Sequence, residues 1–142
     1  MTATSPKKTI NSEFYSGKIS VKLESDPPTA WFASFELQGN EKIGSLSLAS
    51  PLGTTIGNLR WDDRSATVLV GSDTQQFLSF EDALLHLTGA SVSAQTLFLW
   101  LAGKPHMQDG WQPDLSQFSK SKVLARRISP LPAAQLTFVL SP

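Results

Sequence analysis

The stretch "SFEDALLHLTGASVSAQTLFLWLAGKP", residues 79–105, decides the fold, because here the hydrophobic period changes from that of a strand to that of a helix. Ser79 and Asp82 fit a capping box, and Gly89 provides a C-terminal stop. Between them, apolar residues recur at the i, i+3, i+4 and i+7 positions of one helix face: Phe80, Ala83, Leu84 and Leu87. The first half of the stretch therefore predicts an amphipathic helix.

The second half of the stretch predicts another helix, which begins near Ser93 and ends at Gly103 and Pro105. Five consecutive residues within it are large and apolar: Leu97, Phe98, Leu99, Trp100 and Leu101. A helix that is apolar almost all round must be covered on most sides by the rest of the protein. We therefore expect both helices to pack into a concave apolar surface.

On both sides of this stretch the hydrophobic period is two, which predicts half-buried strands. Before the helices they fall within "SGKISVKLES", "WFASFELQG", "IGSLSLA", "TTIGNLRWD", "ATVLVGS" and "TQQF", and after them within "VLARRI" and "QLTFVL". Breakers such as "SDPPT" and "SPLG" separate neighbouring strands. This order predicts a mainly β (α+β) fold, in which an antiparallel sheet curls around the helices as an unclosed half-barrel.

The helices of such an incomplete barrel can act as a lid over a cavity. The hydrophobic pattern fits a solid core and a cavity lining equally well, because the same residue types serve both. The four tryptophans, which are many for this length, leave the same two interpretations open.

Length and composition limit the function. The 142 residues suit one domain, predicted at residues 13–142 after a flexible N-terminal lead-in at residues 1–12. Twelve basic and twelve acidic residues cancel, and no Lys/Arg stripe gathers on any predicted face, so we expect no binding of nucleic acid or of an anionic membrane through charge. There is no cysteine, and no apolar run approaches the roughly 18 residues of a membrane span.

The sequence contains few groups of polar residues that could support catalysis. Neither histidine has an acid or a nucleophile at a spacing typical of a triad or a metal site. Asp62 and Asp63 fit a turn between two strands. If "VLARRI" is a strand, Arg126 and Arg127 point to opposite faces, so at most one of them can point inward. We expect each of these arginines to be a solvated charge at the edge of the sheet. We predict no enzymatic activity, no metal and no cofactor.

The "SPLG" segment fits a type I turn, with Ser50 first, Pro51 second and Gly53 fourth. Its third position, Leu52, points away from both strands. Turn tips normally carry Asn, Asp, Gly or Ser, although a single exposed leucine needs no special explanation. The pattern alone leaves the role of Leu52 open.

Taken together, "FYSGKISVKLE", "SLASPLGTTIGNLRW", residues 79–105 and the closing "LTFVL" resemble the LolB family, the outer-membrane lipoprotein receptor of Gram-negative bacteria. The most specific parts are "SPLG" followed by a strand, and the second helix ending in "WLAGKP". The resemblance implies an unclosed antiparallel β-barrel with a helical lid over a hydrophobic cavity. It also implies that the protein receives a lipoprotein's acyl chains from the periplasmic carrier LolA and delivers them into the inner leaflet of the outer membrane.

The resemblance also suggests sites and partners. The protruding turn of Pro51, Leu52 and Gly53 corresponds to the membrane-insertion loop. The expected acyl-chain cavity would be lined by Val21, Trp31, Phe35, Leu46, Leu48, Trp61, Leu84, Leu97, Trp100 and Leu101. The expected partners are lipoprotein acyl chains, a LolA-like carrier and the inner leaflet, with no nucleic acid, and the chain is expected to be a monomer.

Two features depart from the family. Its members carry an acylated N-terminal cysteine, which this sequence lacks. We therefore expect a soluble form whose precursor is lipid-anchored at the periplasmic face of the outer membrane. The segment "QPDLSQFSKSK", broken by Pro113, predicts missing or irregular edge strands. Two alternatives stay open: a soluble periplasmic LolA-like chaperone for lipids or lipoproteins, and a solid-cored interaction module without a ligand.

Overall fold

The order of strands, two helices and strands expected from the hydrophobic pattern is the order of the elements in space. The computed structural model of the chain describes residues 12–142, so the expected lead-in lies outside the described residues except for its last position. The elements are β1 (Glu13–Leu23), β2 (Thr29–Gly39), β3 (Gly44–Ala49), β4 (Thr55–Trp61), β5 (Ala66–Val70), β6 (Asp73–Phe77), α1 (Phe80–Thr88), α2 (Ala94–Leu101), β7 (Trp111–Asp114), the 3-10 helix η2 (Phe118–Lys120), β8 (Lys122–Arg127) and β9 (Ala134–Leu140).

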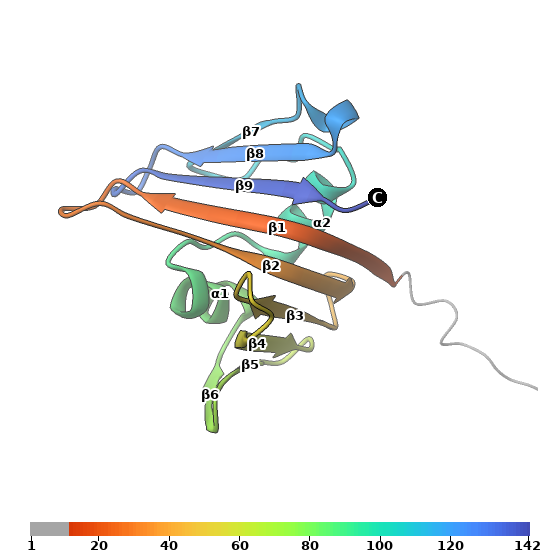
Figure 1. Cartoon of the computed structure of the whole chain (residues 1–142), viewed down its shortest axis with the longest axis vertical. Helices are drawn as coiled ribbons and strands as arrows, with labels where there is room; N and C mark the ends of the chain where they lie inside the picture. The colour runs from red at the N-terminus through yellow and green to blue at the C-terminus, as the bar shows by residue number, and fades with distance from the viewer. Residues whose placement is uncertain (1–11) are drawn as a thin grey trace, which may run out of the picture.

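All these strands form one antiparallel sheet in the order β6-β5-β4-β3-β2-β1-β9-β8-β7. The edge strands β6 and β7 each pair with one neighbour, so the sheet does not close into a barrel. Both helices lie on one side of it, behind the long strands β1 and β2 in Figure 1. The predicted fold, a mainly β unclosed antiparallel half-barrel with a helical lid, is confirmed.

The alternation of apolar and polar residues determines which face of each strand is buried. On β2, Ala33, Phe35 and Leu37 are buried, whereas Ser34 and Glu36 between them are at least partly exposed. Successive side chains of a strand point to opposite faces of the sheet. The buried positions of all the long strands therefore form one apolar inner surface, against which the helices pack.

Local signals fix both ends of α1 and the start of α2 as predicted, whereas α2 ends at Leu101, before the predicted stop at Gly103. The Ser79 side chain accepts a hydrogen bond from the backbone N–H of Asp82 at 3.1 Å, and Gly89 ends α1 in the left-handed region at φ 89°. The Ser93 hydroxyl caps α2 by accepting from the N–H of Thr96 at 3.0 Å. Most of α2 is buried, as its apolar composition requires.

The irregular edge expected near Pro113 is the short strand β7, which pairs only with β8. A proline lacks the N–H needed inside a sheet but is tolerated on an edge strand. The pattern did not identify these four residues as a strand. They add the edge that lies farthest from β6.

Arg127 corrects one expectation, since it is buried rather than a solvated edge charge. It is 8% exposed and lies on the inner face of β8, while Arg126 lies on the outer face and is exposed. Its Nε and Nη2 donate to the carbonyl oxygen of Pro132 at 3.2 and 2.7 Å. The guanidinium carbon also lies 5.9 Å from the centre of the Trp111 ring. These contacts compensate part of the cost of burying the charge.

The pairing register also corrects the expectation that no Lys/Arg stripe gathers on one face. Lys18 and Lys22 of β1 alternate with buried residues and therefore point outward. Lys122 and Arg126 of β8 do the same. Strand β9 lies between β1 and β8, so these four cations share the outer face of three neighbouring strands.

Candidate functional site

A seam of apolar side chains lies between the inner face of the sheet and the two helices. The space left open within it is about 20 Å³, and its lining is apolar apart from one threonine: Ile19, Phe35, Leu37, Leu46, Leu84, Thr88, Ala90, Val92, Leu97, Leu101, Leu136 and Phe138. The Thr88 hydroxyl lies 2.8 Å from the carbonyl oxygens of Leu84 and Ala90, and its one proton is donated between these two acceptors. The seam therefore presents no unsatisfied hydroxyl and favours an apolar ligand.

The seam is almost completely filled. A volume of about 20 Å³ holds roughly one water molecule, whereas a cavity that binds benzene measures roughly 150 Å³. An acyl chain is larger than benzene. It can therefore enter only if the helices and the sheet move apart.

The structure brings five of the ten expected cavity residues to this seam: Phe35, Leu46, Leu84, Leu97 and Leu101. Four others, Val21, Leu48, Trp61 and Trp100, are buried in the same core without lining the open space. Trp31 is half-buried and packs against the edge of the core.

The lining also contains residues that were not among the expected cavity set. Ile19, Leu37, Leu136 and Phe138 share the inner face of their strands, so the period-two pattern was sufficient to find them. The segment from Thr88 to Val92, which connects the helices, carries no comparable periodic signal.

Four indole nitrogens donate to backbone carbonyls around this core. Trp31 donates to Thr88 at 3.3 Å and Trp111 donates to Ser91 at 3.1 Å. These two bonds tie the end of α1 to the central strand β2 and the connection between α1 and α2 to the edge strand β7. In contrast, Trp61 bonds to Asn40 within the strand region. Two tryptophans therefore hold the helical lid closed.

The fourth indole, of Trp100, donates to the carbonyl of His106 at 2.8 Å, just after its own helix. Its ring meets that of Trp111 edge to face at 5.9 Å between centroids. This pair packs α2 against the edge strand β7. The Trp61 and Phe80 rings, 4.7 Å apart, make a similar contact on the β4 side.

The turn between β3 and β4 is held by its own backbone and by Ser50. The N–H of Gly53 donates to the carbonyl of Ser50 at 2.8 Å, and the N–H of Thr54 donates to the Ser50 hydroxyl at 3.2 Å. Gly53 has a φ of 92°, which favours glycine. Pro51 and Leu52 are exposed, Leu52 at 95%. The Leu52 side chain is therefore available to a partner without a role in shaping the turn.

The polar candidates of the sequence have structural roles. The Asp62 carboxylate accepts hydrogen bonds from the N–H groups of Arg64 and Ser65, and these bonds lower its pKa. Asp62 thereby shapes the β4–β5 turn, as predicted. Within residues 12–142, no three His, Cys, Asp or Glu side chains gather as a metal site. No helix in this part of the chain has the length and apolarity to cross a membrane.

Comparisons with known proteins agree with this architecture. The family model described as outer membrane lipoprotein LolB matches residues 14–129. The outer-membrane lipoprotein LolB of Shewanella loihica is 31% identical over 93 residues, which are 66% of this chain and 42% of that protein. The matched part is thus less than half the length of that relative.

Proposed function

Because the chain belongs to the LolB family, we propose that it receives lipoproteins by binding their acyl chains between its sheet and helices and inserts them into the outer membrane. The observation that carries this proposal is the apolar seam, whose single hydroxyl is satisfied within the protein. Apolar contacts are not directional, so they suit a carrier that must accept and release its cargo.

The energetics of acyl chains favour this route. Each buried CH₂ group contributes about 0.8 kcal/mol, so exposing one sixteen-carbon chain to water costs on the order of 10 kcal/mol. A free aqueous step is therefore very slow. We infer that cargo passes directly from a LolA-like periplasmic carrier to the seam and from the seam to the bilayer.

Loading requires the seam to open, and the tryptophan ties suggest where it opens. Trp31 and Trp111 hold the α1–α2 connection through one hydrogen bond each. A hydrogen bond contributes about 1 kcal/mol net, so breaking both costs little compared with the burial of an acyl chain. We infer that the two helices lift together when an acyl chain enters.

We assign the delivery of cargo to the membrane to the exposed turn that carries Leu52. Leu52 contributes about 1.5–3 kcal/mol when its side chain is buried in a bilayer, which is too little to hold a 15.4 kDa protein at the membrane. It is enough to orient the protein while cargo leaves. Stable residence at the periplasmic face of the outer membrane would then come from a lipid anchor on the precursor.

The proposal is tested by adding a fatty acid with a spin label on its chain to the unmodified protein. Spin labels quench tryptophan fluorescence at short range, and the tryptophans surround the seam. We expect strong quenching that exceeds any change of intensity caused by an unlabelled fatty acid of the same length. Absence of quenching would overturn acyl-chain binding.

The same experiment separates the second candidate, a solid-cored interaction module without a ligand. The observation in its favour is the small volume of the seam, about 20 Å³. A solid core predicts no quenching at any concentration of the labelled fatty acid below the one at which it forms micelles.

A further inference from the structure

The outer face of the central strands carries an ordered arrangement of charge. The pairing register places Lys18 next to Val139 and Val139 next to Lys122 in one row across the sheet. A second row, parallel to the first, lies four residues farther along β1 and runs from Lys22 through Gln135 to Arg126. Strands rise about 3.3 Å per residue and lie about 4.8 Å apart, so the four cations mark a rectangle of roughly 13 by 10 Å.

The row between these two rows is uncharged on the central strands. It runs from Phe32 through Ser20 and Thr137 to Leu124. Phe32 is 64% exposed, so a large aromatic ring lies in water beside two lysine-bearing rows. The row reaches an acidic residue only at the edge of the sheet, where Asp114 pairs with Leu124. We call the four cations and this row the outer basic face.

The outer basic face continues into the exposed turn. Ser34 of β2 pairs with Ala49, the last residue of β3, and Phe32 lies two residues farther along β2. Phe32 is therefore beside the turn that carries Leu52. On β4 and β5 the outward side chains of Ile56 and Leu69 extend the apolar surface.

Two shallow depressions accompany the row that contains Lys22 and Arg126. One of about 320 Å³ is lined by Lys22, Leu23, Glu24, Pro28, Thr29, Ala30 and Gln135. The other, of about 200 Å³, is lined by Gln112, Pro113, Asp114, Leu124, Ala125, Arg126 and Gln135. Each is lined by one cation and one carboxylate, Lys22 with Glu24 in the first and Arg126 with Asp114 in the second.

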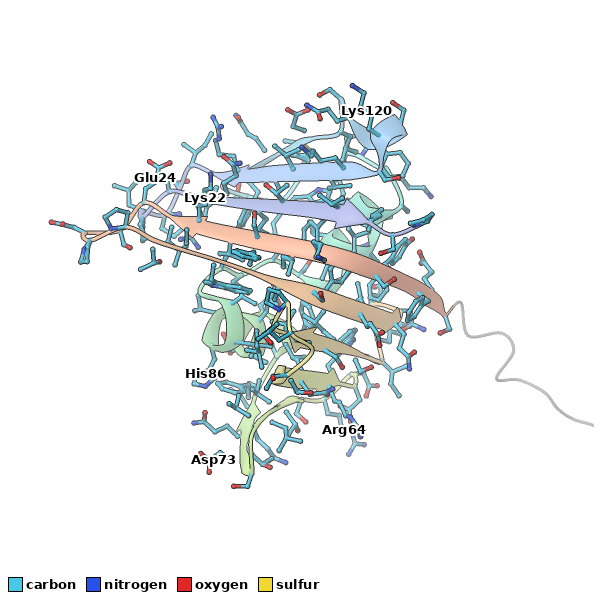
Figure 2. All side chains as sticks on the ribbon, in the orientation of Figure 1. Lys22, Glu24, Arg64, Asp73, His86 and Lys120 are labelled. Carbon is cyan, nitrogen blue, oxygen red and sulfur yellow. The ribbon has the colours of Figure 1, made fainter. Side chains whose placement is uncertain are left out.

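The net charge of zero does not describe how the charges are distributed, because half of the acidic residues lie away from the outer basic face. Half of the twelve acidic residues belong to the turns β2–β3 and β4–β5, to the start of β6 and to the first turn of α1: Glu41, Asp62, Asp63, Asp73, Glu81 and Asp82. In Figure 2, Asp73 lies at the β6 end of the molecule, well separated from Lys22. Three carboxylates, of Glu24, Glu36 and Asp114, lie on or beside the outer basic face and reduce its excess of positive charge.

We propose that the outer basic face is a docking surface for a bilayer that contains anionic phospholipids. The four cations would contact lipid phosphates, while Phe32 and Leu52 enter the boundary between headgroups and acyl chains. This combination of basic and exposed apolar side chains on one surface is typical of proteins that lie on a membrane. An acidic protein partner would satisfy the cations but would leave Phe32 and Leu52 against charged groups.

The proposal deepens the proposed function, since it states which lipids the delivery step recognises. We expect each basic residue near an anionic surface to strengthen binding about fivefold. Removing two of the four should therefore weaken vesicle binding about twenty- to thirtyfold. Binding should also decrease as salt increases, because salt screens charges on exposed surfaces.

The test is co-sedimentation of the full chain with vesicles of phosphatidylethanolamine and phosphatidylglycerol. The test variant is Lys18→Gln with Lys22→Gln. The control variant, Lys42→Gln with Lys104→Gln, removes the same charge from exposed positions outside the outer basic face. We expect only the test variant to lose binding, and we expect the parent to bind weakly to vesicles in which phosphatidylcholine replaces phosphatidylglycerol.

Equal binding by the two variants, or equal binding to both kinds of vesicle, would overturn the proposal. Spin-label quenching by the fatty acid is measured on the same samples and should be unchanged in both variants. A parent that shows no quenching but a clear vesicle difference would refute acyl-chain binding and leave the docking surface intact. An acidic protein as the true partner would appear as vesicle binding that is insensitive to Lys18 and Lys22.

Discussion

The indole nitrogen of Trp111 on the edge strand β7 donates to the carbonyl of Ser91, in the connection between α1 and α2, at 3.1 Å. Trp31 makes the corresponding bond from β2 to Thr88 at 3.3 Å. The two bonds fasten the helical lid to the central strand and to one edge strand of the sheet. The closed state of the seam therefore depends on a few specific contacts as well as on apolar packing.

The first prediction concerns this fastening. Trp111→Phe removes the donor and part of the ring, so it should speed the uptake of an apolar fluorescent dye. It should cost more stability than the roughly 1 kcal/mol of the hydrogen bond, because contacts with Trp100 and Arg127 are also reduced. The matched control is Trp61→Phe, because the Trp61 ring also packs against a helix, at Phe80, but its indole N–H donates to Asn40 and not to the lid. Stopped-flow fluorescence measures the uptake rate. Equal acceleration in both variants would show that dye entry follows general stability.

A second prediction concerns the volume of the seam. Leu97 is buried and lines the open space, so Leu97→Ala should cost about 2–5 kcal/mol and enlarge the cavity. Short fatty acids should then bind more tightly, because less reorganisation is needed to admit them. Leu59→Ala is the control, since Leu59 is fully buried but does not line the seam. Calorimetric titration with octanoate would contradict this account if Leu59→Ala gained affinity to the same extent.

A third prediction concerns Arg127. Lysine lacks the planar group that allows Nε and Nη2 to donate together to Pro132, so Arg127→Lys should cost about 1–3 kcal/mol of unfolding free energy. The neighbouring exposed Arg126→Lys should change stability by less than about 0.5 kcal/mol. The free energy of unfolding of both variants is measured by urea denaturation. Equal midpoints would mean that the hydrogen bonds of the buried guanidinium do not contribute to stability.

The parts of the structure that the sequence predicts well are those with local causes. Both helices and their caps follow from signals within a few residues of Ser79, Gly89 and Ser93, and the strand faces follow from alternation. The turn at Ser50–Gly53 is equally local, since its shape depends on proline, glycine and a serine hydroxyl. Each of these can be derived without knowledge of the pairing of distant strands.

The parts that the sequence does not predict depend on register between distant strands. Lys18 and Lys122 are more than a hundred residues apart, and only the pairing of both strands with β9 brings them to one face. The burial of Arg127 depends on Trp111 and Pro132 in the same way. The volume of the seam cannot be predicted from the sequence either, because core residues and cavity-lining residues have the same composition.

The exposed turn gives the fourth prediction and the most direct test of the central claim, that acyl chains are held at the seam and delivered at Leu52. Leu52→Glu keeps Pro51 and Gly53, so the turn should form and stability should change by no more than about 0.5 kcal/mol. The matched control is Leu131→Glu, which places the same charge at a leucine that is 82% exposed in another loop.

The measurement is lipoprotein transfer with the carrier-to-protein step and the protein-to-liposome step recorded separately. We predict that Leu52→Glu accepts lipoprotein from the carrier as well as the parent does, and that its delivery to liposomes falls sharply while Leu131→Glu delivers normally. Delivery by Leu52→Glu at the rate of the parent would contradict the account and would make Leu52 an ordinary exposed turn residue.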